Sequence, residues 1–376
     1  MASIMKSWMV AMMSLLMLLG ATACRQASMD SDAAAAKNDS VITHARLLTL
    51  ERKPLYTLAI VGDPWKQGSV LHRYVLVPDS IELPGQLPEG TVVRTPIKRA
   101  LVYSAVHTAL MKELGAFDAL KGVTDLQYFT DPDVPARVAA GEVTDCGSSM
   151  GPTVEKVIEM EADAIMLSPY QDATYGQVTR LGIPVIECAD YMESTPLGRA
   201  EWVKFYGELL GRRAQADSLF NAVETAYARV KEQAAAGTAH PTVLTEMVIS
   251  GVWNVPGGES YMARIIGDAG GKYPWADDHS TGSLNLDFNQ VLATAQQADV
   301  WLIKSFNIHS YNDLRAAYAL NEKFAAFENH RVYVCDTNRS RLFERFPFHP
   351  DVLLQEYANI FAGRDGELQF FEHMKQ

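Results

Sequence analysis

The feature that most constrains the fold is a long helical pattern between Thr195 and Ala236. Thr195 is a good N-cap and Pro196 suits the first helical position, while Gly211 predicts a break into two helices. Apolar or aromatic side chains recur every three or four residues, at Trp202, Tyr206, Leu209, Ala216, Phe220, Val223, Tyr227, Val230 and Ala234. The second helix, from Arg212 to Ala236, would be roughly 38 Å long, which is enough to run along two domains.

The segments on either side of this helix have the same character, because each alternates short apolar runs with helical patterns. We predict two α/β lobes with mostly parallel sheets, residues 43–195 and 237–376, joined by the linking helical segment 196–236. The alternative is a single large α/β domain in which this helix is an ordinary surface helix. Residues 154–167 and 288–303 repeat one pattern, a helix followed by Ala-Asp and a strand, which indicates a shared topology.

Two further patterns help to place the strands. The runs Tyr56–Val61 and His72–Val77 predict an antiparallel hairpin with a long loop, and Pro78–Pro96 is a Pro/Gly-rich connection. In the second half, Thr242–Ser250 is predicted as one strand. Ligands of parallel sheets bind outside the carboxyl ends of the strands, so the loops after those ends are the places to look for a site.

The chain begins with the pattern of an export signal. Lys6 precedes an apolar run that is too short to span a bilayer, and small residues follow up to Cys24. This cysteine resembles the lipobox at which bacterial lipoproteins are cleaved and acylated, although Ala21 stands where that pattern usually has leucine. We predict residues 1–23 as signal peptide and 24–42 as a lipidated cysteine with a flexible tether. Cleavage without lipidation is the alternative.

Composition narrows the possible partners. With 376 residues, 48% of them hydrophobic, the chain can bury a sizeable core, and its net charge of -12 disfavours nucleic acid. The later cysteines, Cys146, Cys188 and Cys335, lack metal-ligand spacing and cannot all pair within one chain. We expect them to be small buried apolar side chains.

The order of these segments resembles a known family, the substrate-binding proteins of bacterial ABC importers for iron-siderophores, haem and vitamin B12. The similar stretches are IKRALVYSAVHTALMKELGAFDALKGVTD, GPTVEKVIEMEADAIMLSPY, YGQVTRLGIPVIECADYMESTPLGRAEW, VWNVPGGESYMARIIGDAGGKYPWADDHSTGSLNLDF and FPFHPDVLLQEYANIFAG. In that family a rigid helix joins two α/β lobes, the ligand lies in the cleft between them, and a membrane permease receives it. The resemblance implies a lipid-anchored receptor of the cell envelope, with the periplasm as its expected location.

The resemblance also implies docking residues. In the family, one carboxylate on each lobe pairs with arginines of the permease. Glu155, at the start of its predicted helix, matches the first position. The repeated pattern puts Asn289 at the second, where the family usually has glutamate, and Asp287 two residues earlier is the expected substitute. An acid at a helix start also has a simpler explanation in the helix dipole.

Aromatic and basic residues at or after the predicted strand ends are the candidate ligand contacts. They are Tyr128 and Tyr170 of the first lobe, and Trp253, Trp275, Phe306, Arg339, Arg341 and Arg345 of the second. Flat rings suit a macrocycle or a catecholate chelate, and guanidinium groups suit its negative charge. The alternatives are plain packing for the rings, and a solvated surface or pairing with Glu344 for the arginines.

Nine histidines raise the question of a metal. A receptor for a bare metal ion needs three or four converging ligands, and no HxH or HxxE pair supports one. A single axial histidine to haem iron demands less, and His107 and His279 are the candidates. A hydrogen-bonded structural histidine is the alternative for each.

Enzyme motifs are missing from the sequence, which has no GxSxG, HExxH, P-loop or strand-linked GxGxxG. This absence argues against an enzyme, and the resemblance implies a solute-binding lipoprotein without a cofactor of its own, which delivers its ligand to a permease. The expected ligand is an anionic or macrocyclic metal chelate, with iron-siderophore or haem ahead of cobalamin. A haem-processing or chelatase-like enzyme and a bare-metal receptor are the alternative functions.

Overall fold

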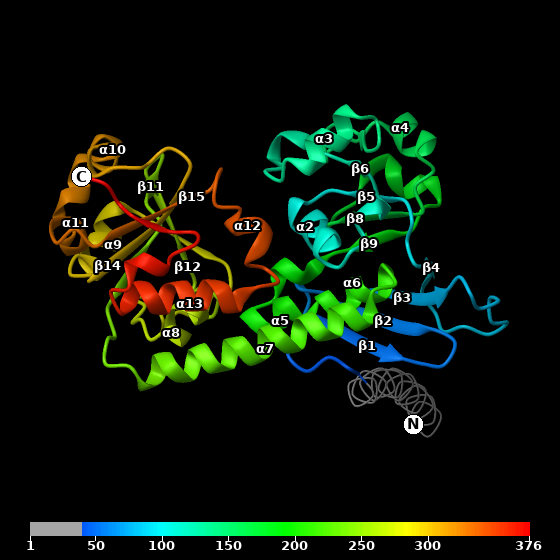
Figure 1. Ribbon diagram of the computed structural model, residues 1–376, viewed down its shortest axis with the longest axis horizontal. Helices are drawn as coiled ribbons and strands as arrows, with labels where there is room; N and C mark the ends of the chain where they lie inside the picture. Colours follow the sequence, from blue (N-terminus) through cyan, green and yellow to red (C-terminus); the bar gives the residue numbers. More distant parts are fainter. Residues whose placement is uncertain (1–39) are drawn as a thin grey trace, which may run out of the picture.

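The computed structural model describes residues 40–376, so the predicted signal peptide and Cys24 lie outside the described residues. Figure 1 shows two lobes side by side, with helix α7 (Arg213–Ala236) running beneath both. Ser40 and Val41 fall in the predicted tether, yet both are hydrogen-bonded to the backbone of Leu50. No helix within the described range is long and apolar enough to cross a membrane.

The N lobe contains strands β1 to β9 and the C lobe contains β10 to β16. The strands are β1 (Leu48–Arg52), β2 (Thr57–Gly62), β3 (Val70–Pro78), β4 (Thr91–Thr95), β5 (Ala100–Val102), β6 (Leu120–Val123), β7 (Thr144–Asp145), β8 (Ala164–Leu167), β9 (Val185–Glu187), β10 (Val243–Thr245), β11 (Val248–Ile249), β12 (Val252–Pro256), β13 (Ser283–Leu286), β14 (Val300–Ser305), β15 (Val332–Asp336) and β16 (Glu372–His373). The other helices are α2 (Ala105–Glu113), α3 (Asp133–Ala139), α4 (Val154–Glu159), α5 (Pro196–Glu201), α6 (Val203–Leu209), α8 (Tyr261–Asp268), α9 (Phe288–Ala295), α10 (Tyr311–Ala317), α11 (Ala325–Glu328), α12 (Leu342–Arg345) and α13 (Pro350–Phe361).

The linking segment folds as the sequence predicts, except that the first predicted helix is divided at Trp202 into α5 and α6. The Thr195 hydroxyl accepts a hydrogen bond from the Gly198 amide at 3.1 Å and caps α5, with Pro196 in the first turn. After α6, Gly211 adopts a φ of 64°, which turns the chain into α7. The predicted second helix begins one residue later than expected and ends at Ala236, where it was predicted to end.

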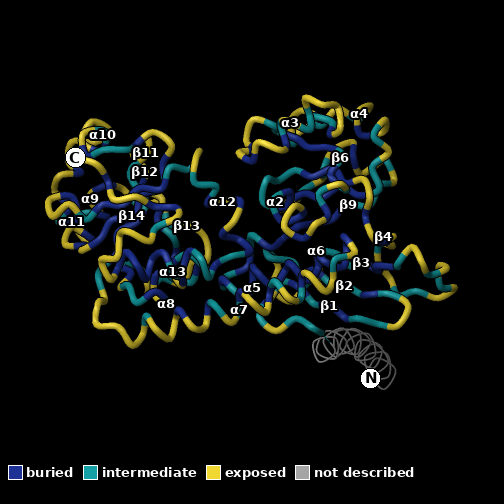
Figure 2. The backbone as a smooth tube through the Cα atoms, in the orientation of Figure 1, coloured by how far each residue is buried: buried dark blue, intermediate teal, exposed yellow. Residues whose placement is uncertain are grey.

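Helix α7 contributes to both hydrophobic cores through one stripe of side chains. Phe220 and Val223 pack in the N-lobe core, whereas Tyr227 and Val230 pack in the C-lobe core. Figure 2 shows the outer side of the helix exposed along its length. Because a single amphipathic stripe enters two cores, it fixes one lobe relative to the other.

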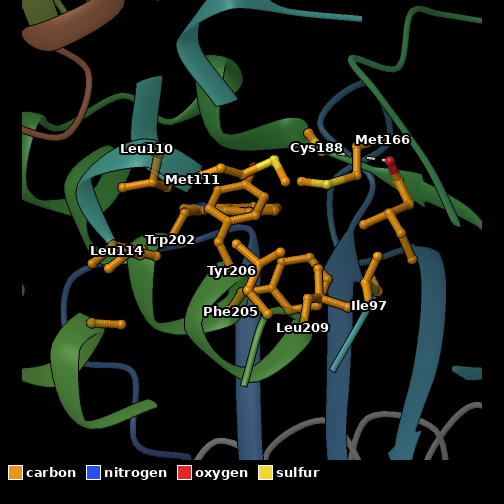
Figure 3. Packing of buried hydrophobic residues seen from close by; sticks show 14 of the residues in the cluster. Ile97, Leu110, Met111, Leu114, Met166, Cys188, Trp202, Phe205, Tyr206 and Leu209 are labelled. Carbon is orange, nitrogen blue, oxygen red and sulfur yellow. Dashed lines mark hydrogen bonds between the residues drawn. The ribbon is translucent and has the colours of Figure 1, made fainter. Parts of the chain in front are cut away.

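The N-lobe core is built around the aromatic side chains of α6. Figure 3 shows Tyr206 of α6 and Trp202, which directly precedes α6, close to Leu110 and Met111 of α2, with Phe205 beside Leu209. The Trp202 and Phe205 rings meet edge to face with centroids 6.0 Å apart. This cluster attaches the linking segment firmly to the lobe that precedes it.

Two sheets form the N lobe. The first has the order β1-β2-β3-β4, and it contains the predicted antiparallel hairpin as β2 and β3. Strand β4, which pairs parallel to β3, lies inside the stretch Pro78–Pro96 that the sequence predicts as a connection. The second sheet is parallel throughout, with the order β7-β6-β5-β8-β9.

The C lobe repeats part of this parallel sheet. Its order is β10-β14-β15-β16, in which the first three strands are parallel and match β5-β8-β9 of the N lobe. The repeated Ala-Asp pattern has a structural role, because Asp163 accepts from the Arg99 amide at 3.0 Å and Asp299 accepts from the Thr242 amide at 2.7 Å. Each aspartate therefore fixes the backbone of the residue that precedes the neighbouring strand, Arg99 before β5 and Thr242 before β10.

The C lobe also departs from the prediction. The predicted strand Thr242–Ser250 is two strands, β10 and β11, and the second belongs to an antiparallel ribbon of β11, β12 and β13. Cys146, Cys188 and Cys335 are buried and free, which confirms that they are apolar core residues.

Replacing Phe220 by alanine tests the attachment of α7 to the N lobe. The change removes a buried ring and leaves a cavity, so we expect destabilisation by about 3–5 kcal/mol. The free energy of unfolding from chemical denaturation measures it, with Asn221→Ala on the exposed side of α7 as the control. The control is expected to stay within about 0.5 kcal/mol of the wild type. A Phe220→Ala protein as stable as the control would contradict the packing described.

Candidate ligand-binding site between the lobes

A cavity of 510 Å³ lies between the lobes. Tyr191 and Met192, which follow β9, line it from the N lobe, while Met247 after β10 and Lys304 on β14 line it from the C lobe. The cavity therefore lies at the carboxyl ends of parallel strands from both lobes, where such folds bind ligands. Its volume is in the range of small-molecule sites.

Most of the wall is apolar. Met192, Met247 and Met262 come from three separate segments, and the rings of Tyr261 and Phe346 stack with centroids 5.8 Å apart. Methionine adapts to irregular apolar surfaces and makes favourable contacts with aromatic rings. Such a wall suits the apolar face of an organic ligand better than a naked ion.

Polar residues also line the cavity, among them Asn254, Ser260, Thr281 and Ser283, and one ion pair lies in its wall. Lys304 Nζ donates a hydrogen bond to Glu246 Oε1, and only 12% of the lysine side chain is exposed. Burial alone lowers the pKa of Lys304, but the attraction of the Glu246 carboxylate outweighs it and holds the pKa well above its usual value. Lys304 is therefore a cation held at the cavity wall.

Glu246 reaches this pair from an uncommon backbone conformation. Its φ is 62°, in the left-handed region that residues other than glycine seldom adopt. The Glu246 amide donates to the Leu302 carbonyl at 2.9 Å, and its own carbonyl accepts from Trp301 Nε1 at 2.6 Å. These two bonds fix Glu246 at the end of β10, and its left-handed backbone divides β10 from β11.

The third charged residue that lines the cavity, Glu193, is committed to the N lobe. Its carboxylate accepts from the Arg46 and Leu47 amides and from Trp202 Nε1, all within 3.0 Å. Burial raises the pKa of Glu193. Because these donors occupy its oxygens, Glu193 anchors the N-terminal segment and offers less to a ligand than Lys304 and Glu246 do.

A buried polar network lies behind the cavity. The Asp190 carboxylate accepts from the Tyr206 hydroxyl at 2.7 Å and from Arg199 Nε at 3.2 Å, and His107 Nε2 lies 2.9 Å from it. Burial alone raises the pKa of Asp190, but His107 and Arg199 hold it below its usual value. Arg199 also donates to the Tyr261 hydroxyl at 3.1 Å, so this network supports the cavity wall.

His107 is a core residue, which corrects its candidacy as an axial metal ligand. The side chain is buried and shares its Nε2 with Asp190 and Tyr206. His279 is 90% exposed, pairs with Glu259 at 3.0 Å and does not line the cavity. Within residues 40–376, no group of three or more His, Cys, Asp or Glu side chains could hold a metal ion.

Arg341 belongs to an ionic clasp between the lobes, which we define as Asp131 and Thr130 of the N lobe with Arg341 and Glu344 of the C lobe. Arg341 Nη2 lies 2.7 Å from Asp131, and the Thr130 hydroxyl donates to Glu344 at 2.6 Å. Burial alone raises the pKa of Asp131, but its bond with Lys112 and the charge of Arg341 lower it. The predicted ligand contact of Arg341 is thus replaced by a protein contact.

The other two arginines do not line the cavity between the lobes. Arg339 is exposed and lies 3.4 Å from Asp336, and Arg345 is exposed beside Gln369. Arg341 and Arg345 line a second space of 390 Å³ on the other side of α12. Pairing with Glu344 was the alternative predicted for these arginines. The structure confirms it for Arg341, whose Nε lies 2.8 Å from Glu344 Oε2.

The predicted aromatic contacts divide into two groups. Tyr128, Tyr170 and Phe306 are exposed by 72%, 51% and 64% and follow strands β6, β8 and β14. Trp253 is fully buried, stacks on Trp301 and donates to a backbone carbonyl, which rules it out as a ligand contact in this conformation. Trp275 is half-buried against the ring of Tyr273, away from the cavity wall, and is thus a packing residue.

The predicted docking residues lie on the surface. Glu155 is exposed in the first turn of α4. Asp287 and Asn289 are exposed at the start of α9, where the Asp287 carboxylate caps the helix by accepting from the Gln290 amide at 2.9 Å. All three side chains are accessible to a partner.

Sequence reasoning missed the ion pair and the methionines. The sequence does contain an indication of Lys304, because it is the single charged residue near the end of an otherwise apolar strand, Val-Trp-Leu-Ile-Lys. Glu246 is indicated in the same way, as the single charged residue within the predicted strand Thr242–Ser250. Nothing in the sequence indicates that the methionines line a cavity, since methionine is common in any core.

Comparisons with known proteins support this architecture. Residues 101–338 match a family model described as periplasmic binding protein. Two proteins of Methanocaldococcus jannaschii, each named an uncharacterized lipoprotein, are 28% and 25% identical over 301 and 331 residues. The matches cover 74% and 83% of this chain and 70% and 84% of theirs.

Solved structures share the fold. The periplasmic heme-binding protein RhuT from Roseiflexus sp. RS-1 is 20% identical with a TM-score of 0.57, covering 71% of this chain and 98% of its own. The periplasmic vitamin B12 binding protein BtuF of Vibrio cholerae is 13% identical with a TM-score of 0.53, covering 72% and 98%. Since the family match spans more than half of the chain and these structures share its two-lobed fold, the chain belongs to the periplasmic binding protein family.

Proposed function

We propose that the protein is the solute-binding receptor of an ABC importer, and that it captures a metal chelate between its lobes. The observation that carries this proposal is the cavity of 510 Å³ lined by methionine and aromatic side chains at the strand ends of both lobes. Such a wall favours a macrocycle or an organic chelate through stacking and burial of apolar area. Fold relatives whose names mention heme and vitamin B12 support this class of ligand.

The exposed rings support a ligand larger than the cavity itself. Tyr128, Tyr170 and Phe306 follow strands whose carboxyl ends lie on the side of the sheets where the cavity lies. In the proposed complex they cover parts of the chelate that remain outside the cavity. The arginines no longer argue for a negative ligand in this cavity, because Arg341 is paired with Asp131 and Glu344 and none of the three lines it.

Purification from the native membrane tests the proposed function. Iron-siderophores, haem and cobalamin are all coloured, so we expect an absorption spectrum that corresponds to one ligand per chain. Denaturation should release that ligand unchanged. A chelatase-like enzyme would instead yield free metal and an empty macrocycle. A colourless protein that binds none of these three ligand types would contradict the proposal.

We further propose that the chain is anchored by lipid on Cys24. Two relatives named lipoproteins and the small residues before Cys24 support this, although the residue lies outside the described range. One acyl chain gives marginal membrane binding and several give stable anchoring. Cys24→Ala should therefore move the protein from the membrane fraction to the soluble fraction. Unchanged membrane association would reject the anchor.

Delivery to a permease is the last part of the proposal, with Glu155 and Asp287 as docking carboxylates. Glu155→Gln should slow uptake several-fold and leave ligand affinity intact, with Glu159→Gln on the same exposed helix as the control. Asp287→Asn removes the second charge and keeps a good helix cap. Uptake by vesicles containing the importer, and ligand titration of each purified variant, measure the two effects. Equal losses of uptake and affinity would assign these residues to folding or to the ligand site instead.

A further inference from the structure

The charged groups of the cavity restrict which chelate can bind, an inference that rests on the proposed function. The charged residues that line the cavity are Glu193, Glu246 and Lys304. Glu193 is held by donors of the N lobe, so a ligand meets one cation and one carboxylate already paired with each other. The cavity therefore offers no unpaired positive charge to an anion.

An anionic group at Lys304 would have to displace Glu246. The Glu246 backbone is fixed on both sides, through the Leu302 carbonyl and Trp301 Nε1, so the carboxylate can leave Lys304 only by rotation of its own side chain. Displacement would leave it at an apolar wall without its cation, which is strongly unfavourable. The two carboxylates that line the cavity add further repulsion.

A neutral group with an acceptor beside a donor avoids this cost. Lys304 has further N–H donors beyond the one given to Glu246, and Glu246 has a second oxygen. An amide supplies both partners at once, because its carbonyl accepts from the ammonium and its N–H donates to the carboxylate. We propose that the cavity selects neutral, amide-bearing chelates, with an amide of the ligand bridging Lys304 and Glu246.

Two observations argue that this pair serves a ligand as well as the fold. Replacing a buried ion pair by apolar side chains is often neutral or stabilising, so such a pair is weak evidence for a stabilising role. Glu246 also holds a φ of 62°, and strained backbone of this kind gathers at binding sites. In an apolar cavity, a few fixed polar groups set the orientation of the ligand.

Titration of the mature protein tests the selectivity. The neutral, amide-bearing probes are cyanocobalamin and ferrichrome, and the anionic probes are haem and ferric enterobactin. We expect a neutral probe to bind at least tenfold more tightly than either anion. Glu246→Gln frees the ammonium of Lys304, so the neutral probe should lose about tenfold and haem should gain, since hydrogen bonds to charged groups carry such factors.

The double variant Lys304→Met/Glu246→Gln covers the case in which the single variant does not fold. It removes both charges, and it should lose about tenfold for the neutral probe without a gain for haem. Arg315→Met/Glu322→Gln removes an exposed ion pair of the same lobe and is the matched control, with no change expected.

Two results would overturn the inference and leave the receptor function in place. One is tighter binding of haem or ferric enterobactin by the wild type. The other is an unchanged preference in the folded variants. Failure of all four probes to bind would instead count against the proposed function itself, and the selectivity would fall with it.

Discussion

The packing of one helix into two hydrophobic cores is the constraint on which the rest of the structure depends. Phe220 of α7 belongs to the N-lobe core and Tyr227, seven residues later, belongs to the C-lobe core. Helix α6 lies close against α7, since a Cβ atom at Gly207 would meet Ala216 at 2.4 Å. Any large rotation of one lobe would expose apolar surface along this stripe, so we expect the two lobes to move little relative to each other.

Helix α12 connects this arrangement of the lobes to the candidate site. Its apolar side chains Leu342 and Phe343 line the cavity, while Arg341 and Glu344 reach across to the N lobe. Figure 1 shows α12 between the two lobes. The cavity wall and the contact between lobes thus share one short helix.

The sequence predicted the elements that local patterns determine. The cap at Thr195, the break at Gly211 and the stripe of α7 depend on neighbours within a few residues, and all are confirmed. The site was less accessible, because its contacts join distant residues. Asp131 and Arg341 are 210 positions apart, so nothing near Arg341 indicates that it is already paired.

Missed elements have similar causes. Strand β4 has five residues within a Pro/Gly-rich stretch, and only its pairing with β3 makes it a strand. Trp253 has the aromatic character expected of a ligand contact. On β12, however, its side chain points into the core and stacks on Trp301. The spacing of apolar residues along the chain indicates where a strand ends. It does not indicate which face of a β-ribbon is buried by the rest of the lobe.

The most direct measurement of the central claim is a crystal structure of the protein purified with its native ligand. The account predicts density for a chelate in the cavity of 510 Å³, between Tyr191 and Tyr261 and in contact with Lys304 and Glu246. The clasp between Asp131 and Arg341 should remain closed. A ligand bound instead beside Arg341 and Arg345, in the space on the other side of α12, would contradict the account.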